Sequence, residues 1–415
     1  MNKIASRFPW WKKVVFSFLP LVLLLALTEG GLWLAGYESP VADPYESFVF
    51  RAPLFVDNGE TVVTDFPRRH FFHEQEFLKQ KPAGAKRVFV FGGSTTYGYG
   101  LANPRQESYV SQLGILLEQK FPGTRFEMIN CGGLSYASYR LVDLVEESMQ
   151  YEPDLVILMS GHNEFIEARH YKDLIDGDSI TNRMWYSIRI VRLLYDLATR
   201  VQEKKPMLTG NPFETEKYIV RDELEFQYTL DHYTRNLNRM ADACQKHKVP
   251  MIISTCPSNL LDQVPFRTDP PAGMSEKEFE QLINKASTLF DAGKYEEVLA
   301  LANGVLKDNP KSAGSHYIAG LCDYQTGRMD EARRHLMAAK DMDAFPKRAL
   351  TSFNERVREI SRQRGLPLFD AEKVFRDASK YGLPGKNLFI DDCHPVLAGH
   401  RLFAEGLLPL AARLL

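Results

Sequence analysis

The sequence has 415 residues, 44% of them hydrophobic and 25% charged, and its formal net charge at pH 7 is −2. This length allows two or three domains, and the composition is that of an ordinary globular protein. The near-zero charge excludes the strongly basic domains that bind nucleic acid, so we expect no nucleic-acid partner. The five cysteines include no Cys-x-x-Cys pair, which argues against zinc-ribbon and thioredoxin-like sites. We expect neither a metal nor a cofactor.

The N-terminal part contains an apolar stretch at residues 14–36. It is long enough to cross a bilayer core of roughly 30 Å, so we predict a membrane anchor that contacts lipid. Basic residues precede it and acidic residues follow it: Lys3, Arg7, Lys12 and Lys13 against Glu38, Asp43 and Glu46. By the positive-inside rule, residues 1–13 lie in the cytoplasm and the rest lies outside it, in a periplasm or at the cell surface. A cleaved signal peptide is the alternative interpretation.

A juxtamembrane segment at residues 37–80 separates this anchor from the first clear strand. It has mixed polarity, and residues 66–77 combine aromatic with basic side chains. We interpret it as a connection that packs on the domain that follows.

Three apolar runs then end in small or polar residues. Residues 88–91 lead into Gly-Gly-Ser94, residues 125–130 into a turn that contains Ser135, and residues 154–159 into Ser-Gly-His-Asn163. Unbroken apolar runs are typical of strands buried on both faces. The carboxyl ends of parallel strands meet at one edge, where open α/β sheets bind ligands. The sequence therefore predicts a doubly wound parallel sheet with a site along this edge.

The pattern weakens at residues 166–226, which we interpret as an insertion over the site, such as a lid or substrate-binding cap. The sheet resumes with a helix at 228–246 and a strand at 250–256. A last short strand is expected at 366–369, and an amphipathic helix ends the chain.

Residues 274–344 form a second insert, which has helical patterns and an internal sequence repeat. Gly293-Lys-Tyr-Glu-Glu-Val and Gly327-Arg-Met-Asp-Glu-Ala lie 34 residues apart. This period, with glycine at the turn between helices, resembles tetratricopeptide repeats. About three repeats are usually needed for independent stability. We therefore expect the insert to be stabilised by packing against the α/β domain. The resemblance implies contact with a protein partner, and structural packing alone is the alternative.

Three sequence blocks carry a second resemblance. Ser94 lies in GGST, Asn163 lies in GHNE, and Asp391 and His394 lie in DDCH. In this order they resemble the blocks of the SGNH (GDSL-like) hydrolases, over about residues 86–415 without the insert. Two departures are present, since Gly93 and Glu164 both stand where the family usually has aspartate.

The resemblance implies an α/β fold with a three-layer, flavodoxin-like, doubly wound parallel sheet. To this the chain adds an all-α, tetratricopeptide-like insert and an N-terminal transmembrane helix. The expected organisation is a cytoplasmic N-terminus (1–13), a transmembrane anchor (14–36), a juxtamembrane segment (37–80), a hydrolase domain (81–273 and 345–415) and the insert (274–344).

Carried over block by block, the resemblance gives each residue a role. Ser94 is the expected nucleophile, His394 the base that activates it, and Asp391 the group that orients the imidazole. A developing oxyanion needs donors, expected from the Ser94 N–H, the N–H near Ser135 and the Asn163 amide. Ser135 falls where the family has glycine, so the donor within the turn at residues 130–138 stays open.

Other polar residues are assigned by position alone. Arg140, Arg169 and Arg348 lie near predicted strand-end loops and are candidates for binding an anionic or carbohydrate substrate. His162 is interpreted as a residue that shapes its turn.

The expected function is that of an extracytoplasmic, membrane-anchored serine esterase that cleaves O-acyl, often O-acetyl, esters. The family resemblance points to acylated carbohydrate of the cell envelope. An O-acetyltransferase of cell-surface polysaccharide that uses the same triad is one alternative. A non-catalytic scaffold that recruits partners through its repeats, and a lysophospholipase, are the others.

Overall fold

A computed structural model describes residues 9–35, 53–166, 188–191, 193, 223–271 and 273–415. The chain divides into two compact units. One contains the N-terminal helix and residues 188–191 and 193, and the other contains all described residues from 53 to 166 and from 223 onward. The lid or cap expected at 166–226 falls almost wholly outside the described residues.

The first unit is built on helix α1 (Trp10–Leu34), which contains Pro20. Its segment Phe16–Leu34 is long and apolar enough to be a membrane span, a test that signal sequences also pass. Near its end, the Glu29 carboxylate accepts hydrogen bonds from the backbone N–H groups of Arg189 and Ile190. The N-terminal apolar helix is therefore present as predicted, and its orientation in a membrane stays a prediction.

The second unit is organised around a sheet of five parallel strands. In order across the sheet they are β5 (Phe126–Gly132), β4 (Lys86–Gly92), β6 (Leu155–Met159), β7 (Met251–Ser254) and β8 (Leu368–Phe369). Counted along the chain from β4, this order is 2-1-3-4-5, that of flavodoxin-like doubly wound folds. The predicted parallel α/β sheet is confirmed. The order reverses at β4 and its neighbours, and ligands of such folds bind at this switch point.

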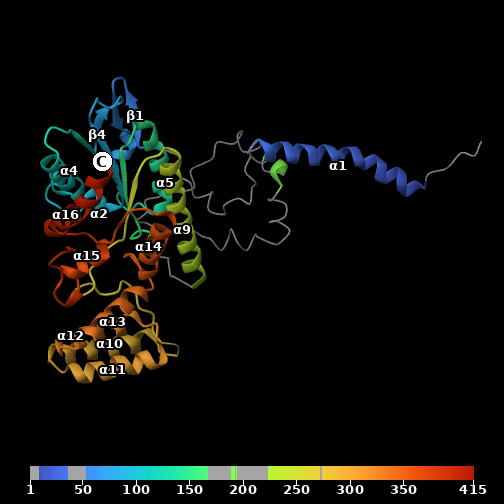
Figure 1. Cartoon of the computed structure of the whole chain (residues 1–415). Helices are drawn as coiled ribbons and strands as arrows, with labels where there is room; N and C mark the ends of the chain where they lie inside the picture. The colour runs from blue at the N-terminus through green and yellow to red at the C-terminus, as the bar shows by residue number, and fades with distance from the viewer. Residues whose placement is uncertain (1–8, 36–52, 167–187, 192, 194–222, 272) are drawn as a thin grey trace, which may run out of the picture. The chain divides into compact units, whose positions relative to one another are not determined.

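Helices lie on both faces of this sheet. Phe89 and Phe91 of β4 belong to an apolar cluster with α5, α9 and α14, whereas Val88 and Val90 belong to one with α4, α15 and α16. Figure 1 shows α4 and α16 on one side of the sheet and α5 and α9 on the other. Burial on both faces explains why the strands are unbroken apolar runs. The helices are α4 (Tyr109–Lys120), α5 (Ser138–Ser148), α9 (Glu223–Lys246), α14 (Thr351–Arg364), α15 (Ala371–Asp377) and α16 (Leu397–Leu414).

A three-stranded antiparallel sheet lies in the segment that the sequence indicated only as a connection. Its strands are β1 (Phe55–Asn58), β2 (Thr61–Thr64) and β3 (Glu76–Leu78). The rings of Phe55 and Phe77 pack edge-on against that of Phe89, with centroids 6.4 and 6.0 Å away. Strands this short show no readable period-two pattern, so the sequence did not reveal them.

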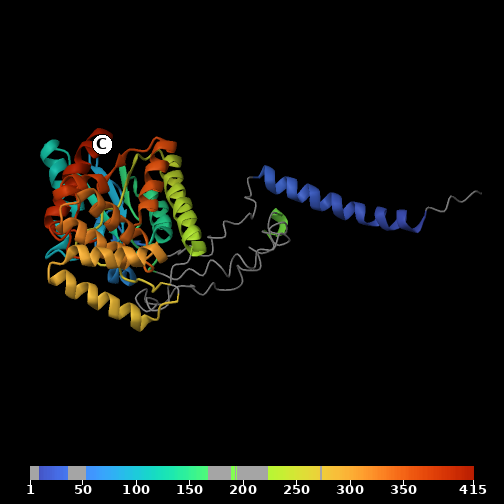
Figure 2. The same ribbon diagram turned by 90° about the horizontal axis from the view of Figure 1, so that it is seen from below.

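The second insert consists of two helix pairs. They are α10 (Glu276–Asp291) with α11 (Tyr295–Asp308), and α12 (Ala313–Gln325) with α13 (Met329–Asp341). Gly293 and Gly327 stand at the turns within the two pairs with φ of +73° and +83°, the left-handed conformation that glycine adopts most easily. The predicted helical, tetratricopeptide-like insert is therefore confirmed. Figures 1 and 2 show its helices stacked as a separate layer of the second unit.

The insert packs on loops of the α/β domain. The Tyr317 hydroxyl donates to the carbonyl of Leu261 at 3.1 Å, and Arg333 donates to the carbonyl of Tyr381 at 2.7 Å. Leu336 of α13 is buried in a cluster with Leu383 from the loop before the last block. An α-helical pair cannot bury its apolar face alone, so these contacts supply the neighbour that a third repeat would otherwise provide.

We predict that Leu336→Ala lowers the free energy of unfolding by about 2–5 kcal/mol, because it leaves a cavity at a fully packed site. The matched control is Ile283→Ala on α10, whose side chain is 40% exposed and whose loss is expected to cost within about 0.5 kcal/mol. Urea unfolding followed by circular dichroism measures both. Equal effects of the two variants would show that the insert does not depend on this contact.

Candidate active site

Ser94 stands where strand β4 turns into the short helix α2 (Ser94–Tyr97). The residue before it, Gly93, lies against Asn163, and a Cβ at Gly93 would stand 2.5 Å from the Asn163 Nδ2 atom. A residue with a Cβ at this position would require the Asn163 amide to move. The local sequence thus places Ser94 and Asn163 side by side at the C-terminal edge of the sheet.

His394 and Asp391 reach Ser94 from a loop near the C-terminus. The His394 Nε2 atom lies 2.6 Å from the Ser94 Oγ atom, although the two residues are 300 apart in sequence. On the other side of the ring, Nδ1 lies 2.7 Å from the Asp391 Oδ2 atom. Because a carboxylate only accepts, Nδ1 carries the proton and Nε2 accepts from the serine hydroxyl. The structure therefore brings all three residues into one chain of hydrogen bonds.

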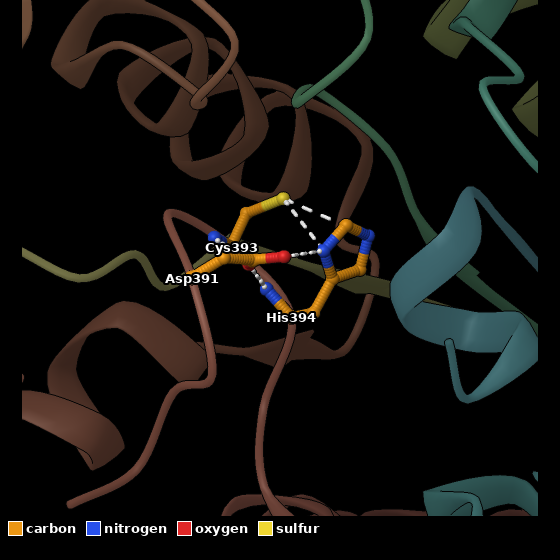
Figure 3. A group of neighbouring side chains, drawn as sticks. All are labelled: Asp391, Cys393 and His394. Atoms are coloured by element: carbon orange, nitrogen blue, oxygen red, sulfur yellow. Dashed lines mark hydrogen bonds and ion pairs between the residues drawn. The ribbon is translucent and has the colours of Figure 1, made fainter. Parts of the chain in front are cut away.

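The Asp391 side chain also shapes the loop that carries it. Its Oδ1 atom accepts from the backbone N–H groups of Cys393 and His394, at 3.0 and 2.9 Å (Figure 3). Burial raises the pKa of Asp391, but the hydrogen bonds and charge of His394 outweigh this and hold that pKa below its ordinary value. Asp391 is therefore a carboxylate at neutral pH and keeps the imidazole oriented.

Asp391, Cys393 and His394 lie close together, and all three are residue types that can ligate a metal ion (Figure 3). Burial raises the pKa of the Cys393 thiol well above its ordinary value, so it stays protonated and is a poor ligand. Both ring nitrogens of His394 already have partners in Asp391 and Ser94. The donor set thus fits the hydrogen-bonded chain better than a metal ion.

The turns after β5 and β6 are tied to each other beside Ser94. The buried Asn163 amide donates to the carbonyl of Tyr136 at 2.9 Å. Glu164 accepts from the backbone N–H of Ser138 at 2.8 Å and from its hydroxyl at 3.0 Å. Ser135 has a φ of +61°, a conformation in which glycine is most common, which fits the place where the family has glycine.

A small cavity opens between these turns. Its lining comprises Gly93, Ser94, Thr95, Tyr136, Met159, Ser160, Gly161, His162 and Asn163. Its volume is about 10 Å³, close to the minimum that holds one water molecule. The space next to the Ser94 hydroxyl is therefore narrow.

The structure describes two of the three arginines predicted to bind substrate, and both make contacts away from the cavity. Arg140 is buried, donates to the Tyr139 hydroxyl at 2.9 Å and stacks over the rings of Tyr136 and Tyr139. Arg169 lies outside the described residues. Arg348 is buried and donates to the carbonyl of Asn259. Neither Arg140 nor Arg348 lines the cavity, and a role in substrate binding stays a prediction.

Arg348 instead braces the loop of Asp391 and His394 through Asn259. The Asn259 side chain donates to the carbonyl of Asp391, and its backbone N–H donates to the carbonyl of Asp392, both at 2.9 Å. Burial lowers the pKa of Arg348, whereas the charges of Asp343 and Asp392 raise it. No sequence pattern around Asn259 indicates this role, because the role depends on a contact between distant loops.

The comparisons with known proteins concern different parts of the chain. The family model of the anaphase-promoting complex, cyclosome, subunit 3 matches residues 272–339, the helical insert. No curated protein matches the chain in sequence. Solved structures that match include an α/β hydrolase enzyme from the metagenome of Lake Arreo, Spain, with 18% identity over 80% of this chain and 96% of that one, and a TM-score of 0.36.

Two further structures come from esterases and lipases. A mutant acetyl-xylooligosaccharide esterase from Geobacillus shares 16% identity over 80% of this chain and 95% of that one, with a TM-score of 0.38. A GDSL-like lipase from Bacteroides thetaiotaomicron shares 12% identity over 81% and 91% of the two chains, with a TM-score of 0.34. The strand order found here is that of flavodoxin-like folds, the class that the sequence resemblance implied. The predicted fold class is thereby confirmed.

We predict that Arg348→Met destabilises the protein by about 1–3 kcal/mol, because it leaves a buried carbonyl of Asn259 without its donor. The control is Arg401→Met, which removes an exposed arginine of α16 and is expected to change stability by less than about 0.5 kcal/mol. Thermal unfolding of the two variants measures the difference. Identical melting temperatures would contradict the bracing role.

Proposed function

We propose that this chain is an SGNH-type serine esterase that cleaves O-acyl esters through a Ser94-His394-Asp391 triad. The observation that supports this most directly is the chain of hydrogen bonds from Ser94 through His394 to Asp391, at 2.6 and 2.7 Å. A serine hydroxyl is a weak nucleophile near pH 7 and needs a base within hydrogen-bond reach. His394 meets that geometric requirement, and Asp391 fixes its tautomer.

In the proposed mechanism, the Ser94 oxygen attacks the ester carbonyl while His394 takes the hydroxyl proton. The resulting oxyanion accepts hydrogen bonds from the Ser94 N–H, the N–H near Ser135 and the Asn163 amide. Ser94 is the first residue of α2, and the first N–H groups of a helix have no acceptor within it. Collapse of the tetrahedral intermediate breaks the ester C–O bond, the leaving alkoxide takes the proton from His394 and departs as the alcohol, and an acyl-enzyme remains. Water then attacks with the same base, and the acid and free serine result.

The cavity supports a short acyl group such as acetyl. The cavity beside Ser94 is narrow, with a volume of about 10 Å³, and its lining includes Gly93, Ser160 and Gly161, which have small or no side chains. The resemblance to SGNH hydrolases favours carbohydrate of the cell envelope as the carrier of this group. Location outside the cytoplasm and anchoring by α1 follow from the charge asymmetry around the apolar helix and are part of this proposal.

An acetyltransferase is the second candidate, because the same acyl-enzyme can react with a sugar hydroxyl instead of water. The insert is proposed to bind a protein partner, as its resemblance to tetratricopeptide repeats implies. A scaffold without catalysis would need neither the Ser94–His394 contact nor the Asp391 turn that holds it. Product analysis separates the esterase from the acetyltransferase. Free acetate alone supports an esterase, whereas acetylated sugar formed from a donor supports a transferase.

We predict that Ser94→Ala and His394→Ala each lower the rate of p-nitrophenyl acetate hydrolysis by at least about 10⁴-fold, because both remove the reacting pair. Asp391→Asn is expected to lose on the order of 10⁴-fold by disturbing the histidine tautomer. Ser111→Ala and the exposed His70→Ala are matched controls that should keep full activity. Activity that survives in Ser94→Ala would contradict the proposal.

A further inference from the structure

The active-site cavity contains a polar side chain that the proposed mechanism does not use. His162 lies in the turn after β6, lines the cavity together with Ser94, and is only 7% exposed. Its Nδ1 atom accepts a hydrogen bond from the backbone N–H of Ala349 at 3.1 Å. Its Nε2 atom is buried and has no hydrogen-bond partner within the part of the chain that the structure describes.

The contact with Ala349 fixes the chemical state of this imidazole. A nitrogen that accepts a hydrogen bond carries no proton, so the hydrogen of the neutral ring is on Nε2. Burial, helped by the positive charges of Lys340 and Arg348, lowers the pKa of His162 to about 3. The ring is therefore neutral near pH 7, with a fixed N–H donor at Nε2.

A buried donor without an acceptor is rare in folded proteins, and such groups often belong to functional sites. Here the donor belongs to a residue that lines the cavity beside the Ser94 hydroxyl, and Asn163 is its direct neighbour in sequence. A neutral imidazole can polarise a carbonyl without competing with His394 for a proton, as in enzymes that use neutral histidine as an electrophile. An ester in this cavity would bring the missing acceptor.

We propose that the Nε2–H of His162 donates a hydrogen bond to an oxygen of the ester bound in this cavity, which makes His162 a further catalytic residue. This inference rests on the proposed esterase function. It assigns the two ring nitrogens to separate tasks: Nδ1 holds the backbone of Ala349 and Nε2 binds substrate. The two tasks can be removed one at a time.

Asparagine and glutamine make this separation. The side-chain amide of asparagine reaches the position of Nδ1. His162→Asn therefore keeps an acceptor for the backbone N–H of Ala349 and loses the donor at Nε2. The amide of glutamine reaches the place of Nε2, so His162→Gln keeps a donor at that place. We measure kcat and KM for p-nitrophenyl acetate, with the melting temperature, on the full chain in detergent beside wild type and Ser94→Ala.

We expect His162→Asn to lose about 100-fold in kcat, as removal of one oxyanion-type donor does, and His162→Gln to recover at least about 10-fold of this. The asparagine variant should nevertheless melt no lower than the glutamine variant. A His162→Asn enzyme as active as His162→Gln would overturn the inference, even though Ser94-dependent activity in wild type would leave the esterase proposal intact.

A second measurement does not require turnover. In protein labelled with ¹⁵N at histidine and asparagine, the Nε2–H signal of His162 is identified by its loss in the His162→Asn variant. Acetate, which resembles the product of deacetylation, is then titrated as the probe, with the Asn163 side-chain amide as the reporter of its binding. A shift of the His162 signal together with that of Asn163 supports the inference. A His162 signal that stays unchanged throughout the titration overturns it, whether or not the protein is an esterase.

Discussion

The hydrogen bond between His394 and Ser94 is the contact on which the proposed chemistry depends. The serine follows the first strand of the sheet, and the histidine lies on a loop near the end of the chain. A separation of even about 1 Å from the productive geometry can cost on the order of 100-fold in rate. The fold must therefore hold a late, irregular loop in a fixed place above the sheet edge.

Several polar contacts, buried or partly buried, supply that rigidity. Asp391 folds its own loop by accepting two backbone N–H groups, and Asn259 ties the same loop to the segment after β7. Arg348 then holds Asn259, and Ala349, its neighbour, holds His162. Arg348 and Ala349 lie on the link between the insert and α14, so the end of the insert and the active site share one network. The end of the insert is thereby connected to the loop of His394 through Arg348 and Asn259.

The strands and the insert could be predicted because their signals are local. The run Val88 to Phe91 has no alternation because both of its faces are buried, and Gly293 and Gly327 mark turns that need a left-handed residue. The blocks that contain Ser94, Asn163 and His394 could be selected because the carboxyl ends of parallel strands share one edge.

The remaining features depend on contacts between distant segments. The sheet of β1 to β3 was missed because its strands are too short to show a period. The position of Arg348 near a loop predicts substrate binding, which stays a prediction, but no local pattern indicates that its side chain donates to the carbonyl of Asn259. The state of His162 depends on the N–H of Ala349, 187 residues away, which no pattern near His162 encodes.

The most direct test of the central claim is to identify the residue that becomes acylated. The full chain is treated with a fluorophosphonate, which reacts with activated serine nucleophiles, and the modified peptide is identified by mass spectrometry. The account predicts one modified site at Ser94, no label in Ser94→Ala, and slow labelling in His394→Ala. An unlabelled wild-type protein, or label that persists in Ser94→Ala, would contradict it.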